Sequence, residues 1–446
     1  MSKVLRQLTT IQRSGTIAIM GTLHSAPTSS LDVCAFLLPA ILTVEKWCLH
    51  AATCLATVLL KHPLYKQVRT SISCCTMHHS TPIQILFANF AHNPKLIEKK
   101  PTKPHNPMQR GLLPFVTNIP PTKEASVREA MQAQEVIMIF SDSSAIGGNV
   151  GATAILNHAG QLHQMLHYHL GPDSEHMVHE AELIGVFLAV HLIQTKENAK
   201  VSITIGVDNQ AALGLFNMEL NNPAHNIARE IIGQGNILKK GRGCKAHQIT
   251  LQWTAGHEGI LGNELADLEV KKAADGLTSD KCMLPCFLRH KLTTNPSTVK
   301  QKHDADLKNK WKSEWCSSHR GKKLVAIDAN TPSAFFLQSI SKADLSCRSA
   351  SMITQLITAH IPLNSYLKRI NKVDSVRSPS CRATNETVWH FLLACPGYAH
   401  EQWALEARLK EKHKHLTYNN ILGNADFFVP LANYINMSHR FSPMNY

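Results

Sequence analysis

The middle of the chain alternates short apolar runs with helical patterns, and their order predicts a mixed α/β domain. Residues 136–140 form a continuous apolar run suited to a strand buried on both faces, and Gly147-Gly148 marks a turn after it. Further strands are expected over 150–156, 162–170, 201–207 and 249–253. Helices are expected over about 177–194, from 209, over about 224–238 and over about 262–275. The order βββαβααβα predicts a mixed five-stranded sheet with helices on its faces.

Both flanks of this α/β segment, residues 134–276, are predicted to be helical. Within residues 1–93 an apolar stripe recurs at helical spacing through Ile41, Val44, Trp47, Cys48, Ala51, Leu55, Val58 and Leu59. Seven prolines lie between residues 94 and 121, so residues 94–133 are predicted to be a linker without helix or central strand. Residues 277–446 are expected to form a helical C-terminal region that is rich in lysine.

Charge is distributed unevenly between these segments. Residues 1–134 carry 14 Lys and Arg against 5 Asp and Glu, and residues 277–446 carry 23 against 12. Residues 135–276 carry 9 against 15, so an acidic middle lies between two basic flanks in a chain of net charge +14. This distribution favours a nucleic-acid partner for the flanks and metal-binding carboxylates in the middle, although basic flanks are also common as plain solvated surface.

The cysteines and the apolar stretches indicate the compartment. Twelve cysteines lie along the chain without paired spacing, which favours reduced thiols and an intracellular protein, nuclear or cytoplasmic. The first residues lack the apolar core of a signal peptide. The apolar stretch 31–60 is interrupted by Pro39, Glu45 and Lys46. We therefore expect no secretion, no membrane span and no membrane partner.

Four acidic residues occupy positions where an α/β sheet gathers functional groups. Asp142 and Asp208 follow predicted strands, Glu182 lies in the early turns of the long helix, and Asp267 lies in the last helix. An acid at the end of a buried strand is costly unless a metal or hydrogen bonds compensate it. Each acid alone also has an ordinary explanation, as a cap, a favourable helix N-terminal charge or a solvated helix residue. Their joint occurrence favours one shared site.

Four sequence blocks carry a resemblance to a known family. They are Ser141-Asp142-Ser143-Ser144, Glu180-Ala181-Glu182-Leu183, Val207-Asp208-Asn209-Gln210-Ala211-Ala212 and residues 253–267, which end in Gly262-Asn263-Glu264-Leu265-Ala266-Asp267. The segment resembles a type 1 RNase H domain, especially those attached to fungal-type non-LTR (LINE-like) retrotransposon reverse transcriptases. The blocks span 127 residues, from Ser141 to Asp267, in the order that this family has. The resemblance implies an RNase H-like fold.

The resemblance also implies a metal-dependent endonuclease that hydrolyses the RNA strand of RNA–DNA hybrids and leaves 5′-phosphates. Asp142 would bridge two Mg²⁺ ions, and Asp267 would complete the ion that activates water. Glu182 and Asp208 would hold the ion at the leaving oxygen. Hard oxygen ligands suit Mg²⁺ or Mn²⁺ rather than zinc. The family's glutamate directly precedes a leucine, which favours Glu182 over Glu180.

Other positions of these blocks resemble family residues that assist catalysis or bind substrate. His257 lies on the loop before the last helix, where the family's histidine assists the water or the leaving product. Positions that resemble substrate contacts are Asn209, Gln210 and Asn263. Two positions depart from the family: Ser143 replaces a usual glycine and Ala255 a common proline. Ser143 would strain the turn if that position needed a positive φ, which would reduce activity without loss of the fold.

The flanks resemble the same retrotransposon proteins more weakly. Gly21–Pro27 and His62-Pro63-Leu64 resemble the region that follows the polymerase palm, but the chain has no Tyr-x-Asp-Asp motif. We therefore expect no DNA synthesis and interpret the chain as a C-terminal fragment of such an element. In the tail, residues 381–395 resemble a Cys-Cys-His-Cys zinc motif. Cys381, His390 and Cys395 remain, and Thr384 stands where the second cysteine is expected. Three ligands make a doubtful zinc site, and a decayed motif held by packing is an equal alternative.

Two other functional classes remain open at this point. A catalytically decayed, nucleic-acid-binding relic is supported by Ser143 and Thr384 and by the missing polymerase motif. A transposase or integrase shares the sheet topology, but it uses three acids and lacks the Gly-Asn-Glu-x-x-Asp ending found at residues 262–267. Cleavage of a hybrid, binding without cleavage, and strand transfer on duplex DNA distinguish the three.

Overall fold

The apolar runs in the middle of the chain become the strands of one sheet. The computed structural model describes residues 3–73, 80–90, 93–100, 113–132, 137–158, 161–194, 203–215, 224–241, 249–411 and 414–441. The chain forms two units: the first comprises Met1–Trp47 with Asp304–Tyr446, and the second comprises Cys48–His303. The sheet belongs to the second unit.

The sheet is mixed and has six strands rather than the predicted five. The strands are β1 (Phe115–Asn118), β2 (Ile137–Ile146), β3 (Asn149–His158), β4 (Gln161–Pro172), β5 (Ile203–Val207) and β6 (Ile249–Trp253). Their spatial order is β1-β6-β5-β2-β3-β4. The strands β2, β3 and β4 pair antiparallel, whereas β1, β6, β5 and β2 pair parallel. The predicted order βββαβααβα is confirmed for the elements from β2 onward.

The sixth strand corrects the interpretation of residues 94–133 as a linker. β1 pairs with β6 from Phe115 opposite Ile249, and helix α6 (Lys123–Gln132) follows it. The prolines lie outside these two elements: Pro114 precedes the strand, and Pro120 and Pro121 precede the helix. Because β1 is an edge strand, it forms beside a proline that a central strand would exclude.

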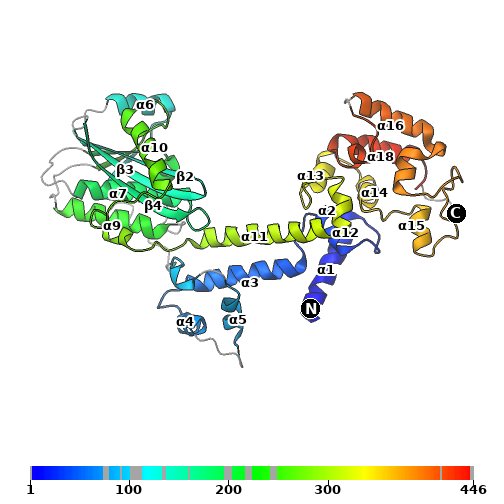
Figure 1. Cartoon of the computed structure of the whole chain (residues 1–446), viewed down its shortest axis with the longest axis horizontal. Helices are drawn as coiled ribbons and strands as arrows, with labels where there is room; N and C mark the ends of the chain where they lie inside the picture. Colours follow the sequence, from blue (N-terminus) through cyan, green and yellow to red (C-terminus); the bar gives the residue numbers. More distant parts are fainter. Residues whose placement is uncertain are drawn as a thin grey trace. The chain divides into compact units, whose positions relative to one another are not determined.

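Helices cover both faces of the sheet. Alternation along β2 sends Ile137 and Ile139 into the core shared with α7 (Val178–Gln194) and α9 (His225–Gly241). Met138 and Phe140 point to the opposite face, where they pack with residues of α6 and α10 (Leu261–Ala274). Figure 1 shows the sheet between these two layers. The period-two alternation of the strand therefore builds two hydrophobic layers.

Two glycines allow α10 to lie close against the sheet. A Cβ on Gly151 of β3 would overlap the backbone of Ala274, and a Cβ on Gly262 would overlap the ring of Phe140. α10 packs on β2 and β3 through these contacts. The close approach sets the position of the acidic residue that α10 carries.

Helices flank the sheet domain on both sides in sequence, as predicted. The boundary between the two structural units, however, does not coincide with the boundaries of the predicted regions. Helices α4 (Tyr65–Ser73) and α5 (Pro82–Ala88), together with part of α3 (Ala40–Ala56), belong to the unit that contains the sheet. A small core joins these helices to the start of α11 (Pro296–Ser317), because Ala52, Phe90 and Ile97 pack with Val299.

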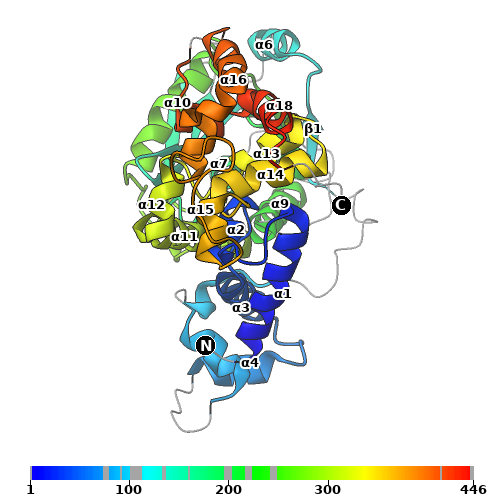
Figure 2. The same ribbon diagram turned by 90° about the vertical axis from the view of Figure 1, so that its right-hand side faces the viewer.

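The first unit is helical and combines residues from both ends of the sequence. Its helices include α1 (Lys3–Met20), α2 (Thr28–Cys34), α12 (His319–Val325), α13 (Phe335–Lys342), α14 (Cys347–Thr358), α15 (Asn364–Arg369), α16 (Ala399–Glu411), α17 (Tyr418–Leu422) and α18 (Phe428–Met437). Gln355 of α14 donates to the backbone carbonyl of Gly21 at 2.9 Å, and α14 also packs on α2 and α18 (Figure 2). The fully buried Glu386 accepts two hydrogen bonds from Arg440, each at 2.7 Å. No helix among the described residues is both long enough and apolar enough to cross a membrane.

Candidate active site

Two of the predicted acids lie side by side on neighbouring strands. Ser141 of β2 pairs with Val207, the last residue of β5, so Asp142 and Asp208 follow at the same level of the sheet. Asp142 does not end its strand, as the apolar run had suggested, because β2 continues to Ile146 in pairing with β3. Trp253 Nε1 donates to the backbone carbonyl of Asp208 at 3.0 Å and fixes the chain there.

Glu182 reaches the same edge from α7. A Cβ on Gly185 would lie 3.3 Å from Ser141 Cβ, so this glycine lets the helix lie close to β2. Ser143 Oγ donates to Glu182 Oε1 at 2.8 Å, and Asn209 Nδ2 donates to the same oxygen at 3.4 Å. A side chain within β2 and one that follows β5 therefore orient this carboxylate.

Asp267 completes the set from α10, on the other face of the sheet. Lys271, one helical turn later, donates from Nζ to Asp267 Oδ2 at 2.7 Å. The charge of Asp267 contributes to raising the pKa of Asp142, so the two carboxylates interact. Four acids that are distant in sequence thus face one region at the sheet edge.

Hydrogen bonds compensate the buried acids of this region only in part. Burial, together with the charges of Asp208 and Glu182, raises the pKa of Asp142 to about 8. Burial and the charge of Asp208 raise the pKa of Glu182 to about 7. Burial also raises the pKa of Asp208, which a hydrogen bond from Asp142 opposes. In the metal-free protein a proton shared between these two acids therefore reduces their repulsion.

The carboxylates suit divalent cations because their donors are oxygens and because one buried oxygen has no hydrogen-bond partner. Asp208 Oδ1 is buried and has no hydrogen-bond partner, which leaves an acceptor that a cation would satisfy. All of the donors are hard oxygens, the type that Mg²⁺ and Mn²⁺ prefer. Among the described residues, no three of these acids have ligand atoms all within 4.8 Å of one another. Cation binding therefore requires the mutually repelling carboxylates to draw together.

The second acid of the helix motif, Glu180, has a different position. Its Oε2 accepts from the backbone N–H of Met177 at 3.0 Å and lies 3.2 Å from His176 Nδ1. These contacts close the first turn of α7, where a negative charge is favourable. Glu180 is thus occupied at the helix start, whereas Glu182 interacts with Asp208.

The remaining predicted site residues differ in how close they come to the carboxylates. His257 is exposed on the loop between β6 and α10 with φ of +57°, and its charge lowers the pKa of Asp208. Asn209 accepts from the Ala211 N–H at 2.9 Å, so it caps α8 (Gln210–Leu215) as well as contacting Glu182. Gln210 is exposed. Asn263 is buried, and its Oδ1 has no hydrogen-bond partner.

Two contributions were missed or misjudged from sequence. Ser143 would have strained a turn only if its position needed a positive φ, but it lies inside β2 without one, and its hydroxyl binds Glu182. Lys271 was not singled out, although its spacing of four residues from Asp267 on a predicted helix was a usable signal.

A second cluster of ligand-type residues lies in the first unit. Ligand atoms of Cys381, His390 and Cys395 all lie within 4.8 Å of one another. Cys381 Sγ is 3.3 Å from His390 Nε2, and Thr384 Oγ1 is 3.0 Å from His390 Nδ1. Backbone N–H groups of Ala383 and Thr384 help to lower the pKa of the Cys381 thiol to about 6, whereas burial raises that of Cys395.

Comparison with known proteins supports the assignment of the sheet domain. Residues 134–275 match the RNase H family model. A crystal structure of a Prototype Foamy Virus protease–reverse transcriptase mutant is similar at 20% identity and a TM-score of 0.27, covering 33% of this chain and 22% of that chain. The structure of LC9-RNase H1, a type 1 RNase H with the type 2 active-site motif, is similar at 17% identity and a TM-score of 0.24, covering 33% of this chain and 75% of that chain. No curated protein matches the chain.

Residues 134–275 thus match the RNase H family, and the described part of this segment has an RNase H-like fold. The match covers about a third of this chain and less than a quarter of the foamy-virus protein's length.

Proposed function

We propose that this domain hydrolyses the RNA strand of RNA–DNA hybrids with the help of divalent cations. The observation that carries the proposal is the group of buried, mutually repelling carboxylates in which Asp208 Oδ1 has no partner. Buried acids without compensation are costly in a purely structural role. Bound cations would offset the repulsion between these carboxylates, and they would supply the charge stabilisation that phosphoryl transfer needs.

Asp142, Glu182, Asp208 and Asp267 are the residues that would hold the cations, with Asp142 shared between two of them. Bound Mg²⁺ or Mn²⁺ supplies charge stabilisation on both sides of an in-line phosphoryl displacement. Ser143 and Asn209 hold Glu182 Oε1 by hydrogen bonds, so its other oxygen stays available. Lys271 binds Oδ2 of Asp267 in the metal-free protein, so this contact leaves Oδ1 for a cation.

His257 is proposed to move protons at the water or the leaving oxygen. It is exposed, and its charge acts on Asp208, as expected for a group beside the reacting phosphate. Asn209, Gln210 and Asn263 are proposed to contact the hybrid. A His257→Ala variant is expected to lower kcat while leaving Mn²⁺ binding unchanged.

The test is cleavage of a labelled hybrid by the full chain in Mg²⁺, with two adjacent acids compared. Glu182→Gln is expected to lower the rate by a factor of about 100 or more, because a ligand oxygen loses its charge. Glu180→Gln keeps an oxygen for the Met177 N–H and is expected to retain activity within a few-fold. Equal losses in both variants, or no loss in Glu182→Gln, would reject the assigned ligand set.

A catalytically decayed relic is the competing function. Such a protein retards a hybrid in a gel but does not cut it in Mg²⁺ or Mn²⁺. We favour the active enzyme because Ser143 lies within β2 and supports Glu182, so its departure from the family removes no ligand. Origin from a fungal-type retrotransposon remains part of the proposal, and a polymerase palm with a Tyr-x-Asp-Asp motif encoded directly upstream would support it.

Zinc binding by Cys381, His390 and Cys395 is a second proposal, favoured by the convergence of their ligand atoms. Because structural zinc sites use four ligands, the Thr384 position makes this site weak. Thr384→Cys is expected to raise zinc affinity at least tenfold in competition with a chelating dye, and Cys395→Ser to abolish binding. Unchanged affinity in Thr384→Cys would show that the three side chains are held together by packing alone.

A further inference from the structure

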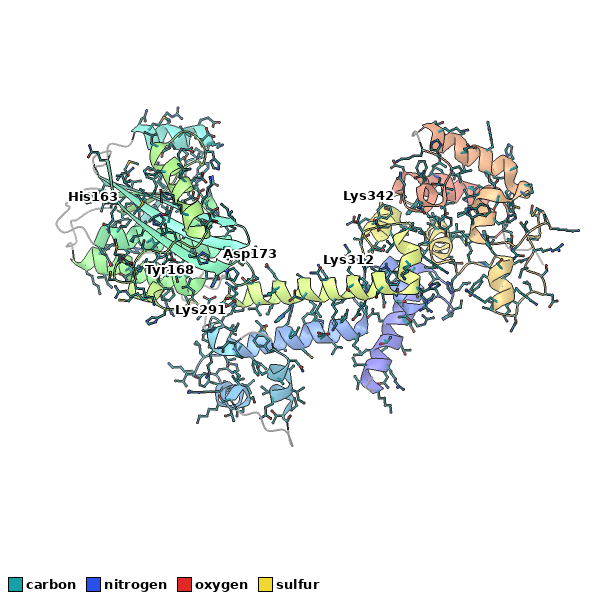
Figure 3. The ribbon with its side chains drawn as sticks, viewed as in Figure 1. His163, Tyr168, Asp173, Lys291, Lys312 and Lys342 are labelled. Atoms are coloured by element: carbon teal, nitrogen blue, oxygen red, sulfur yellow. The ribbon has the colours of Figure 1, made fainter. Side chains whose placement is uncertain are left out.

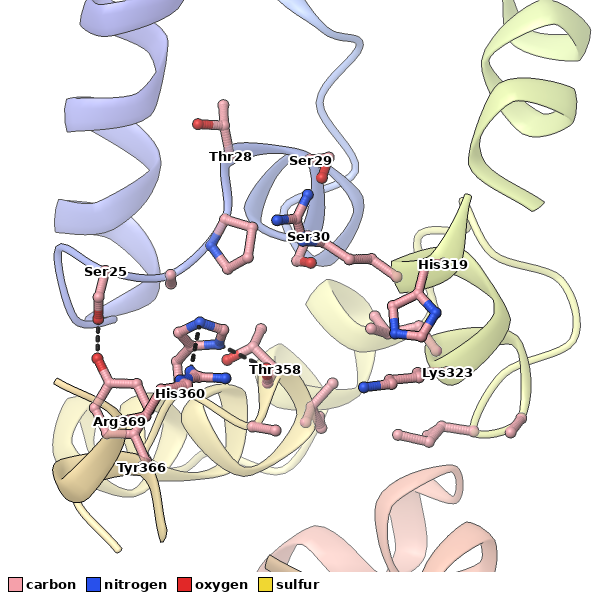
Figure 4. A pocket seen from close by; sticks show the side chains of 18 of the residues that line it. Ser25, Thr28, Ser29, Ser30, His319, Lys323, Thr358, His360, Tyr366 and Arg369 are labelled. Atoms are coloured by element: carbon pink, nitrogen blue, oxygen red, sulfur yellow. Dashed lines mark hydrogen bonds between the residues drawn. The ribbon is translucent and has the colours of Figure 1, made fainter. Parts of the chain in front are cut away.

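A large cavity lies within the first unit, far along the sequence from the carboxylates. Its volume is about 1100 Å³, and its walls come from residues 25–30, α12, the end of α14, and α15. Figure 4 shows Ser25, Thr28, Ser29 and Ser30 above the cavity, with His319 and Lys323 opposite Arg369 and His360. Both ends of the sequence are needed to form it.

The lining is strongly basic. Its cations are Arg13, Arg320, Lys323 and Arg369, joined by His319 and His360, and no Asp or Glu occurs among the described residues that line the cavity. No salt bridge within 4.0 Å joins any of these four cations to a carboxylate in the described part of the chain. The charge of Asp32, which does not line the cavity, interacts with Arg13. The other three cations repel one another without such a partner at the wall, so an anionic ligand would stabilise it.

Arg369 packs over a buried aromatic ring and presents its exposed guanidinium at the cavity. Its guanidinium lies over the ring of Tyr366 at 5.1 Å from the centroid, and the ring of His360 is 5.4 Å from that of Tyr366. Arg369 Nη2 donates to His360 Nε2 at 3.3 Å, so Nδ1 carries the proton and donates to the Thr358 carbonyl at 2.9 Å. Burial lowers the pKa of His360, and the charges of Arg369 and Arg320 lower it further. This wall is therefore neutral at the histidine and cationic at the exposed arginine.

The start of α2 supplies hydroxyl groups to the cavity. Arg13 donates to the Ala26 carbonyl at 2.7 Å and to Thr28 Oγ1 at 2.9 Å, which fixes this segment. Ser29 is exposed at the cavity. Arg13 is thus occupied in part, whereas Arg320 and Lys323 are exposed cations for which the described residues provide no salt bridge.

We infer that this cavity binds a short segment of single-stranded nucleic acid. Phosphates are bound by exposed cations and hydroxyls, and unpaired bases stack on aromatic rings and arginine planes. The volume of about 1100 Å³ lies just above the range of about 300–1,000 Å³ for small-ligand sites, which suits several linked units rather than one small anion. A duplex has no free base faces to stack on this wall. The inference concerns the first unit and does not rest on the proposed nuclease activity.

The test is fluorescence anisotropy of the full chain with labelled oligonucleotides of about 12 nucleotides in EDTA, which prevents metal-dependent cleavage. The probes are oligo(U), oligo(dT) and a blunt DNA duplex, and the two single strands distinguish RNA from DNA as the source. The variant Lys323→Ala/Arg369→Ala is expected to weaken single-strand binding by about tenfold or more. Its plot of log Kd against log salt concentration is expected to lose about two units of slope.

Neighbouring cations on the same helices provide matched controls. Lys322→Ala/Lys368→Ala removes the same charge from α12 and α15 at exposed positions that do not line the cavity. Lys342→Ala on α13, labelled in Figure 3, is a more distant control. Binding that weakens equally in the cavity variant and in the controls would overturn the inference. Tighter binding of the duplex, with the same dependence on Lys323 and Arg369, would overturn the assignment to single strands.

Discussion

Neutralising Asp142 is expected to stabilise the metal-free protein while it abolishes catalysis. Its carboxyl is 5% exposed, and its pKa of about 8 exceeds the ordinary value of 3.8. Each pKa unit corresponds to about 1.4 kcal/mol, so keeping this group protonated at pH 7 costs the fold about 4 kcal/mol. Asparagine does not ionise and therefore removes that cost, but burial of its polar amide is itself unfavourable. We therefore expect Asp142→Asn to raise the free energy of unfolding by about 2 kcal/mol.

The gain should depend on pH in a defined direction. A carboxyl whose pKa is raised by folding destabilises the protein above its unfolded pKa. The penalty therefore grows from about pH 4 to about pH 8 and vanishes below about pH 4, where both states are protonated. The difference between Asp142→Asn and the wild type should follow the same curve.

The assay is thermal unfolding of the EDTA-treated full chain, monitored by hydrogen exchange in the Ile137–Ile146 strand. This local readout reports on the unit that contains the sheet, since two units need not unfold together. A gain of about 2 kcal/mol corresponds to about 4–8 °C in a unit of this size. The matched control is Asp173→Asn, which removes the same charge from an exposed position (Figure 3).

The reasoning is refuted if Asp142→Asn unfolds at or below the wild-type temperature at pH 8. A difference of the same size at pH 4 and pH 8 would equally contradict it, because titration of the carboxyl could not then be the cause.

Two further predictions concern packing and a buried ion pair. Gly151→Ala is expected to destabilise the second unit by about 1–3 kcal/mol, because its Cβ would overlap the backbone of α10 at Ala274. Urea unfolding measures this loss, and an unchanged midpoint would contradict the close packing. Arg440→Ala is expected to lower the free energy of unfolding of the first unit by about 3–5 kcal/mol, because it leaves the fully buried Glu386 without its partner. A loss below about 1 kcal/mol would indicate that water solvates that carboxylate.

The order of the elements and the acidic motifs were predictable because they depend on local pattern. The period-two and period-3.6 patterns identified every element from β2 to α10, and the motif blocks selected Glu182 over Glu180. The edge strand at Phe115 was not predictable, because nearby prolines hid it and its stability depends on pairing with Ile249, more than 100 residues later.

Burial was harder to predict for helices that are apolar on most sides. Ile41 and Trp47 belong to the apolar stripe that predicted a helix, but these residues are 49% and 63% exposed, whereas Ala52 and Ala56 are buried. The pattern indicated a helix, α3, but it could not identify the face that packs. The basic cavity was beyond sequence analysis for a similar reason, since Arg13 and Arg369 meet only through the tertiary fold.

Cleavage of a hybrid tests the central claim most directly. The full chain is incubated with a labelled RNA–DNA hybrid, with single-stranded RNA and with duplex DNA, with and without Mg²⁺, in parallel with Asp142→Asn and Asp208→Asn. The account predicts that the wild type cuts only the RNA of the hybrid, only with Mg²⁺, and that neither variant cuts. Cleavage that persists in both variants, or an intact hybrid in the presence of a folded wild-type chain and Mg²⁺ or Mn²⁺, would contradict it.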